Sequence, residues 1–351
     1  MQPRSIGIAA FCSLAFAAVG VLAVGQTSLA GNVGPDSVPD IHTLMAEYER
    51  PSWIPFPEEN PHSQAKEALG RALYFDPRLS RSNMQSCASC HNPSFAWGDG
   101  LPKGVGDRMN QLGRRSPTIL NSAWAEAFMW DGRFETLEEQ ALGPIQSGVE
   151  MNMSMVDLLP KLQAIAEYRD MFAAAFGGSP EITAEKIAMA IATYERTVVS
   201  GTAPFDRWIA GEETAISEAA KRGFVVFNEK GNCAACHSDW RFTDDSLHDI
   251  GLPGADIGRG KQLPTVAKMQ YAFKTPGLRN IDRRGPYMHD GSVPTLEAVI
   301  EHYDTGGVAR PSLSDEMKPL GLTEQEKADL VAFLKTLTSE DPPVEFVMLP
   351  R

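Results

Sequence analysis

Two Cys-x-x-Cys-His pentads are the residues of this sequence best suited to chemistry. The first is Cys87-Ala-Ser-Cys90-His91, and the second is Cys233-Ala-Ala-Cys236-His237. In such a pentad the two thiols can form thioethers to the vinyl groups of one haem, and the imidazole can ligate its iron. Each pentad therefore predicts one covalently bound c-type haem. The alternatives are disulfides or a shared zinc site, which needs four ligands that converge on one metal.

The chain repeats itself around these pentads. Three motifs of the first half recur in the second half: Pro117-x-Ile119-x-Asn121 as Pro276-x-Leu278-x-Asn280, Met129-Trp130-Asp131-Gly132 as Met288-His289-Asp290-Gly291, and Thr136-Leu137-Glu138 as Thr295-Leu296-Glu297. All three pairs share an offset of 159 residues, which chance similarity would not preserve. We interpret the chain as a duplicated unit with one haem in each copy.

Helical patterns surround both pentads. A glycine precedes each pentad, Gly70 in the first copy and Gly223 in the second, where it would let a crossing helix approach closely. Apolar spacing predicts a helix around residues 187–194, and the capping box Thr323-x-x-Glu326 predicts the start of the last helix. Strand-like alternation is scarce. The predicted fold is mainly α, with two tandem class I cytochrome c-like haem domains.

Three segments divide the chain. Residues 1–30 predict a secretory signal peptide, because Arg4 is followed by a long apolar run and a small-x-Ala cleavage site. Residues 31–200 form the predicted N-terminal domain and 201–351 the C-terminal domain, joined at a linker that begins at Ser200. We expect the mature protein in the periplasm without stable membrane insertion. An uncleaved anchor is the alternative, because the apolar run is long.

The net charge of −13 limits the choice of partners. Such a surface does not suit nucleic acid, and it favours a basic or neutral partner or simply serves solubility.

The two copies differ at the position expected to ligate the second face of each iron. A protein ligand there favours electron transfer, whereas an open face admits peroxide. The second copy offers His302 and Tyr303, and at the shared offset Tyr303 corresponds to Pro144, which cannot coordinate iron. We therefore predict that the first haem lacks this ligand, whereas the second haem can have one.

The stretch from Cys87 to Met151 resembles the bacterial dihaem cytochrome c peroxidases and the related MauG proteins. The shared motifs are Asp99-Gly100-Leu-Pro, Gly113-Arg-Arg-Ser-Pro-Thr118, Phe128-Met-Trp130-Asp-Gly-Arg133, Leu137-Glu-x-Gln140 and Glu150-Met151, with Leu278-Arg-Asn280 and Pro286-Tyr-Met-His289-Asp-Gly-Ser292 in the second half. Two departures favour the MauG branch. The peroxidases place a distal histidine where this chain has Asp107, and a methionine where it has Tyr303. MauG proteins have a tyrosine at the second of these positions and a five-coordinate first haem. The resemblance therefore implies an open first haem and a second haem ligated by His237 and Tyr303, with His302 or the nearby Met317 as the alternative ligand.

The resemblance also implies roles for three residues around the open haem. Glu150 corresponds to the family's distal carboxylate, which would move a proton between the two oxygens of peroxide. Gln140 would orient peroxide or water by a hydrogen bond. Trp130 corresponds to a tryptophan that bridges the two haems and would relay charge, although packing alone would also explain a tryptophan there. A methionine among residues 151–155 that capped the first haem would defeat this interpretation.

We therefore expect a dihaem oxidase of the MauG type. Hydrogen peroxide would react at the His91 haem, and the pair of haems would oxidise a Trp or Tyr of a secreted partner protein over a long distance. One alternative is peroxide reduction with electrons from a small cytochrome c or cupredoxin, and another is a dihaem electron carrier without catalysis. The resemblance also implies a calcium ion between the domains, but Arg115 and Arg284 stand where Asn and Thr are expected.

Overall fold

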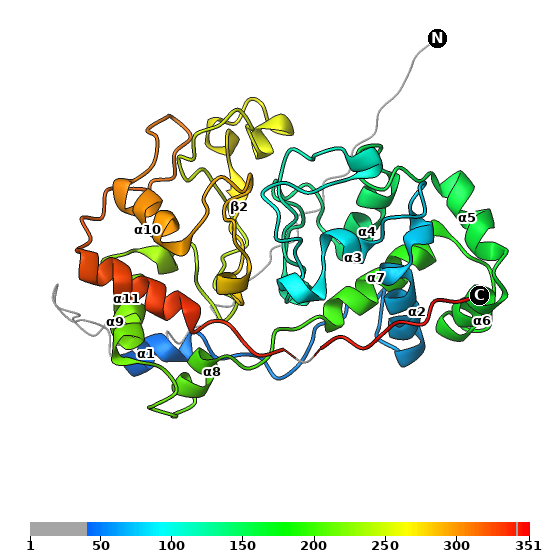
Figure 1. Ribbon diagram of the computed structural model, residues 1–351, viewed down its shortest axis with the longest axis horizontal. Helices are drawn as coiled ribbons and strands as arrows, with labels where there is room; N and C mark the ends of the chain where they lie inside the picture. The colour runs from blue at the N-terminus through cyan, green and yellow to red at the C-terminus, as the bar shows by residue number, and fades with distance from the viewer. Residues whose placement is uncertain (1–40, 342) are drawn as a thin grey trace, which may run out of the picture. The chain divides into compact units, whose positions relative to one another are not determined.

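A computed structural model describes residues 41–341 and 343–351 (Figure 1). The predicted signal peptide lies outside these residues. Regular structure within them is almost entirely helical, and the named strands are only β1 (Leu247–His248) and β2 (Phe273–Lys274), which pair in antiparallel fashion. Short 3-10 helices lie in the remaining chain, at Pro77–Leu79, Pro93–Phe95, Asp107–Met109, Ser122–Trp124, Cys233–Ala235, Arg259–Lys261, Ala267–Met269 and Ile281–Arg283. The prediction of a mainly α fold is confirmed.

One group of helices forms around the first pentad. Helices α2 (Gln64–Phe75) and α7 (Ala184–Thr197) cross at its centre, and α4 (Leu137–Gln146) also packs on α7. Helices α5 (Met155–Gln163) and α6 (Ala166–Ala175) close the outer side of the same apolar core (Figure 1). The first pentad begins the one-turn helix α3, Cys87–Cys90.

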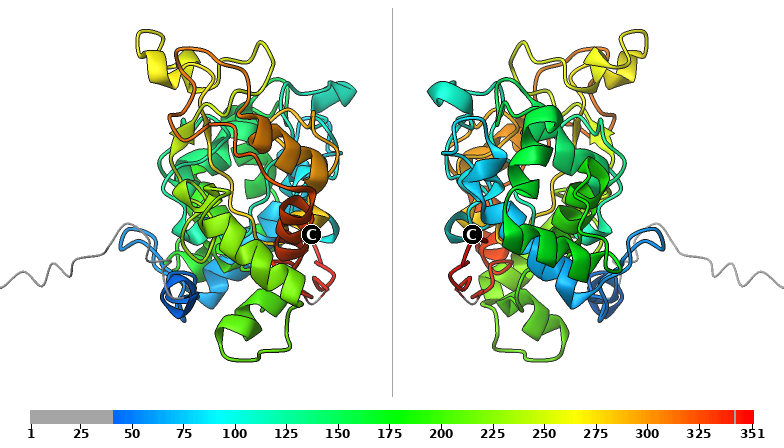
Figure 2. Two further views of the ribbon diagram at one scale, coloured as in Figure 1. Left: turned by 90° about the vertical axis from the view of Figure 1, so that its left-hand side faces the viewer. Right: turned by 90° about the vertical axis from the view of Figure 1, so that its right-hand side faces the viewer.

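A second group forms around the other pentad. Helix α9 (Glu218–Asn228) crosses α11 (Glu324–Lys335), and α10 (Leu296–Thr305) packs against α11. Helices α1 (Ile41–Ala46) and α8 (Pro204–Ile209) contribute to the same core (Figures 1 and 2). The predicted capping box is present at the start of α11, where Thr323 and Glu326 cap each other's backbone.

Glycine makes both helix crossings close, as the sequence predicts. A β-carbon at Gly70 would overlap the carbonyl oxygen of Ala190 on α7, and one at Gly223 would overlap that of Asp329 on α11. At each of these points the backbones of the two helices are therefore in direct contact, and only glycine fits.

The backbone repeats along with the sequence. Asn121 and Asn280 both adopt the left-handed conformation, and each begins a short 3-10 helix. Helices α4 and α10 each begin after a threonine, Thr136 or Thr295, whose side chain accepts a hydrogen bond from the helix backbone. The isolated bridge between residues 128 and 134 recurs between residues 287 and 293, at the same offset. The two copies therefore share one local architecture.

The asparagines of this repeat each hold a serine beyond the copy's last core helix. The side-chain oxygen of Asn121 accepts a hydrogen bond from the backbone N–H of Ser200 at 3.0 Å, and that of Asn280 accepts one from Ser339 at 2.9 Å. Ser200, the first residue of the predicted linker, is thus buried and fixed to the first copy. The division at residues 200 and 201 stays a prediction.

The two ends of the described chain pack on the opposite copy. Tyr48, just after α1, is buried in the second core, and its hydroxyl donates to Asn228 at 2.7 Å. At the other end, the carbonyl of Pro350 accepts a hydrogen bond from Arg78 of the first copy at 2.8 Å (Figure 1, red). Each copy is therefore completed by a segment from the far end of the sequence. Among the described helices, none is both long and apolar enough to cross a membrane.

Candidate functional site

The two pentads open onto one cavity of about 840 Å³. Every residue that the sequence marks for a function lines it: Cys87, Cys90, His91, Cys233, Cys236, His237, Trp130, Gln140, Glu150 and Tyr303. None of the four pentad cysteines is in a disulfide. Helix formation, the helix crossings and the repeated turns together bring these distant residues to a single space.

Each pentad histidine is oriented by a backbone carbonyl. The Nδ1 atom of His91 lies 2.8 Å from the carbonyl oxygen of Pro117, and that of His237 lies 2.9 Å from the carbonyl oxygen of Phe242. A carbonyl only accepts hydrogen bonds, so Nδ1 carries the proton and Nε2 keeps its lone pair. Burial lowers the pKa of both imidazoles, which keeps them neutral. Both histidines are therefore prepared to ligate a metal through Nε2.

This arrangement fits two haems and does not fit one zinc ion shared by the pentads, because no group of possible metal ligands among the described residues combines the two pentads. Each half of the cavity presents its own pair of free thiols beside a histidine whose Nε2 atom is available, and the apolar lining is extensive. Several buried polar atoms that face the cavity have no protein partner, including the Nε atoms of Arg115 and Arg284 and the Oε2 atom of Glu195. The fold and this site together define a dihaem c-type cytochrome.

In the first copy a proline stands at the position equivalent to Tyr303, and proline cannot coordinate iron. Pro144 lies within α4 and lines the cavity. Glu150, half-buried in the turn after α4, and Gln140, on α4 itself, face the same space. Asp107 is buried and accepts a hydrogen bond from Asn152 at 2.9 Å, and it is not among the residues that line the cavity.

The methionines near Glu150 belong to the apolar core. Met151 and Met153 are buried within it, and Met155 packs against its edge. Met151 also lines the cavity, so the alternative of a methionine cap on the first haem applies to this residue alone.

The second copy presents a tyrosine at the position equivalent to Pro144. Tyr303 lies in α10 and lines the cavity, and burial raises the pKa of its hydroxyl group. Within residues 41–341 and 343–351 this hydroxyl makes no hydrogen bond. The neighbouring His302 instead points to the carbonyl of Ile250, with its Nε2 atom 2.9 Å from that oxygen. Met317 also lines the cavity. Tyr303 as the iron ligand stays a prediction that this placement favours.

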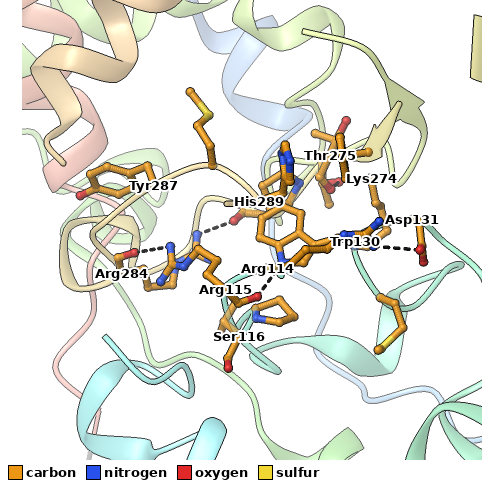
Figure 3. Close-up of a pocket in the computed structure, with 18 of the residues that line it drawn as sticks. Arg114, Arg115, Ser116, Trp130, Asp131, Lys274, Thr275, Arg284, Tyr287 and His289 are labelled. Carbon is orange, nitrogen blue, oxygen red and sulfur yellow. Dashed lines mark hydrogen bonds and ion pairs between the residues drawn. The ribbon is translucent and has the colours of Figure 1, made fainter. Parts of the chain in front are cut away.

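Trp130 lies where the two copies meet (Figure 3). Its indole N–H donates to the carbonyl oxygen of Arg115 at 2.9 Å, and its own carbonyl accepts from the backbone of Lys274 at 2.8 Å. Its ring meets His289 edge to face, with 6.4 Å between ring centroids. His289 is the residue that corresponds to Trp130 in the repeat. Residues from both copies therefore fix the orientation of the indole.

Arg114 joins the copies beside Trp130, and sequence reasoning missed this role. Its guanidinium donates to Asp131 at 2.8 Å (Figure 3). It also donates to Asp256 of the second copy at 2.6 Å. Burial opposes ionisation of both acids, but the hydrogen bonds from Arg114 outweigh it and lower the pKa of each carboxyl. Asp131 stands in the repeated Trp-Asp-Gly motif, but nothing local points to a partner 142 residues away.

Two further features of the cavity were also missed. His289 stacks on Phe273 with 3.6 Å between ring centroids, and burial lowers the pKa of His289 to about 4. Glu195 on α7 is buried at the cavity wall, and burial raises the pKa of its carboxyl to about 8. In the sequence Glu195 looks like any acidic residue of an amphipathic helix, so only the packing reveals it.

Comparison with known proteins gives the same class of protein. A family described as di-haem cytochrome c peroxidase matches residues 64–214, and a cytochrome c family matches residues 220–338. The methylamine utilization protein MauG of Methylorubrum extorquens is 53% identical over 94% of this chain and 95% of its own length. The protein of that name from Methylophilus methylotrophus is 47% identical over 95% of this chain and 97% of its own length.

The chain belongs to the dihaem cytochrome c peroxidase and MauG family, and within it lies closer to MauG. The cytochrome c551 peroxidase of Pseudomonas aeruginosa is 34% identical over 84% of this chain and 87% of its own length. Among solved structures, a MauG-like protein associated with microbial copper homeostasis is 34% identical with a TM-score of 0.76, over 84% of this chain and 95% of that one. The protein is thus an oxidoreductase that carries two c-type haems.

Proposed function

We propose that this protein is a periplasmic MauG-type oxidase that uses hydrogen peroxide to oxidise an aromatic residue of a partner protein over a long distance. The observation that carries this proposal is the difference between two equivalent helices. At equivalent positions, α4 carries Pro144 and α10 carries Tyr303, and both residues line the cavity. The bound haems supply the iron chemistry, which is cleavage of peroxide and storage of its oxidising equivalents.

The two pentads hold the haems in this proposal. Cys87 and Cys90 would attach the first haem and His91 would ligate its iron, while Cys233, Cys236 and His237 would do the same for the second haem. Tyr303 would offer a phenolate oxygen to the second iron. A hard anionic donor stabilises the higher oxidation states of iron, whereas the thioether of a methionine stabilises the reduced state. This ligand would suit the second site to hold oxidising equivalents.

Glu150 and Gln140 both line the cavity and would act on peroxide beside the first haem. Peroxide accepts two electrons and two protons and leaves as two waters, and the first proton must move from the near to the far oxygen. Glu150 is placed at the cavity wall to carry that proton. The Gln140 side-chain amide is held near Met129, with its Nε2 atom 3.7 Å from the sulfur, and would orient the peroxide.

Trp130 relays the electrons between the two sites. An oxidisable aromatic ring between two redox centres divides one long transfer into two shorter ones. The hydrogen bond to Arg115 and the edge contact with His289 hold the indole in one orientation, so it does not have to reorganise during transfer. The electrons come from a Trp or Tyr of the partner protein, which is oxidised by two electrons for each peroxide.

The periplasmic location is supported by the predicted signal peptide at residues 1–30.

The experiment that tests the function adds hydrogen peroxide to the holoprotein together with candidate secreted proteins. Mass spectrometry then identifies oxidised Trp or Tyr residues on the partner. We expect oxidation that requires both peroxide and the holoprotein, and that is lost in Glu150→Gln but kept in Glu126→Gln, which changes an exposed acid outside the cavity. Oxidation that persists in Glu150→Gln would contradict the role of that residue.

A second measurement separates the proposal from ordinary peroxide reduction. Reduced small cytochrome c and reduced cupredoxin are offered as electron donors, and peroxide consumption is followed. Rapid turnover with such a donor, without any oxidised residue on a partner protein, would favour a cytochrome c peroxidase. Two low-spin haems in the EPR spectrum and no reaction with peroxide would instead favour an electron carrier.

A further inference from the structure

Two buried arginines at the meeting point of the copies have no acidic partner among the residues that the structure describes. Five arginines are buried among the residues that the structure describes. Three of them form ion pairs with carboxylates: Arg196 with Glu138, Arg241 with Asp245 and Arg279 with Asp206, at 2.6–2.7 Å. The other two, Arg115 and Arg284, form no ion pair with any described residue, although they are only 8% and 6% exposed.

These two side chains lie next to each other on the cavity wall (Figure 3). Arg115 donates through Nη1 to the carbonyl oxygen of Arg284 at 2.6 Å, and Arg284 donates to the carbonyl of Gly277. The Nε atom of each guanidinium is buried and has no hydrogen-bond partner. Neutral carbonyl groups thus position the two guanidiniums. One N–H donor on each guanidinium has no acceptor among the described residues.

The charges of this pair are uncompensated. Burial and then the charge of Arg115 lower the pKa of Arg284 to about 9, and burial lowers that of Arg115. A buried cation is stable only when an anion or several hydrogen bonds replace its hydration, and two adjacent cations make that need greater. The missing group is therefore an anion, and the planar guanidinium is best matched by a carboxylate.

The haems bring such carboxylates, because each carries two propionates. Arg115 stands two residues before Pro117, whose carbonyl oxygen orients His91, so it lies on the side of the first pentad. Arg284 donates to the carbonyl of Gly277 in the second copy. The backbone N–H of the next residue, Leu278, donates to Arg241, which precedes the Phe242 carbonyl that orients His237, so Arg284 lies on the side of the second pentad.

We propose that Arg115 and Arg284 form an anion site that binds haem propionates, Arg115 from the first haem and Arg284 from the second, in place of a calcium ion between the domains. Calcium binds through six to eight oxygen ligands. A guanidinium has no acceptor atom and repels a cation, and Arg115 already occupies the carbonyl of Arg284. The calcium site implied by the family resemblance therefore does not fit this chain. The positive charges of Arg115 and Arg284 would stand in place of the charge of the calcium ion.

The first test measures the reduction potentials of both haems in holoprotein variants. Arg284→Gln removes a positive charge beside the second haem, so its ferric form gains stability and its potential falls. A propionate without its partner also takes up a proton more readily, so the potential becomes more dependent on pH between about pH 5 and pH 8. Arg284→Lys keeps the charge and should retain most of the original potential. Arg283→Gln, at the exposed neighbouring position, should change neither quantity.

Unchanged potentials in Arg284→Gln would overturn the proposal. If that variant fails to incorporate haem, Arg115→Gln provides the same test at the first haem.

The second test needs no variant. The wild-type holoprotein is treated with EGTA, and its calcium content and haem spectrum are measured. We expect no stoichiometric calcium before treatment and no spectral change after it. One tightly held calcium per chain, with a changed spectrum when it is removed, would overturn the proposal. The double variant Arg115→Asn/Arg284→Thr, which replaces both cations by oxygen donors, should gain calcium binding measurable by mass spectrometry of the metal.

Discussion

The phenol ring of Tyr303 fills its place at the cavity wall whether or not its oxygen binds iron, and a single-atom change separates these roles. Tyr303→Phe keeps the ring and removes the oxygen. We expect the low-spin signal of the second haem to be lost or shifted in EPR and absorbance spectra, because its iron loses a ligand. Tyr48→Phe, which removes a hydroxyl from the apolar core of the second copy but outside the cavity, should leave the spectrum unchanged. A shifted spectrum in Met317→Leu with none in Tyr303→Phe would instead identify Met317 as the ligand.

Glu150 offers a second test at the scale of one residue. Glu150→Gln preserves shape and hydrogen bonding but cannot carry a proton. We expect the rate of peroxide cleavage to fall by roughly two to four orders of magnitude, while haem content and both resting spectra stay the same. Stopped-flow absorbance after mixing with peroxide measures this rate. A rate equal to that of the wild type would show that the proton follows another route, for which the buried carboxyl of Glu195 is the alternative group at the cavity wall.

Some residues of the candidate site could be predicted from the sequence, and others could not. The pentads were predictable because their chemistry depends on neighbours in the chain, and Trp130, Gln140 and Glu150 were predictable because they stand in family motifs. All of them line the cavity. The ion pair between Arg114 and Asp256 was not predictable, because both residues have ordinary sequence surroundings and meet only after the two copies pack together.

At the scale of helices, the duplicated sequence becomes two equivalent sets of elements with different chemistry. Helices α4 and α10 begin after the equivalent threonines Thr136 and Thr295, and each helix is ten residues long. The helix crossings could also be predicted, because a glycine before each pentad lets a second helix approach closely. The packing of the termini could not be predicted, because nothing in residues 41–48 indicates that they pack on the second copy.

The crossing of α9 and α11 leads to a prediction about stability. Gly223→Ala would drive its β-carbon into the carbonyl oxygen of Asp329 and close to the β-carbon of Phe333. We expect the free energy of unfolding to fall by about 1–3 kcal/mol, because the two helices must separate at their closest point. Guanidinium unfolding, followed by far-UV circular dichroism, measures this change. Gly148→Ala is the matched control, since the nearest atom to its β-carbon would be 3.9 Å away. Equal effects of the two substitutions would contradict the close crossing.

At the scale of the whole molecule, the two copies are joined at one main place. Trp130 and Arg114 of the first copy contact the second copy beside the cavity, and the backbone N–H of Arg115 donates to the carbonyl of His289 at 2.9 Å. The exchanged termini add connections at the opposite ends of the chain. The contact that would carry electrons between the haems is therefore also the contact that holds the copies together, so loss of one should impair the other.

The ion pairs of Arg114 make this contact sensitive to acid. Asp256→Asn removes one of its two carboxylate partners, and we expect the free energy of unfolding at pH 7 to fall by about 1–3 kcal/mol. Because Arg114 lowers the pKa of Asp256 below the ordinary value of about 4, the stabilisation is complete above that value and is lost as the pH falls through the lowered pKa. The difference between wild type and variant should therefore be constant from pH 7 to pH 5 and shrink only below about pH 4.

Chemical denaturation of the holoprotein at several pH values, followed by haem absorbance, measures this difference. Asp315→Asn, which removes an exposed ion pair with Lys268, is the matched control and should have little effect, because water and salt screen exposed charges. A variant as stable as the wild type at pH 7 would show that Arg114 needs only Asp131. A difference that already vanishes at pH 5 would show that the pKa of Asp256 is not lowered. If both expectations hold, the same variant should also slow electron exchange between the two haems, since Trp130 is bonded to the backbone of the residue next to Arg114.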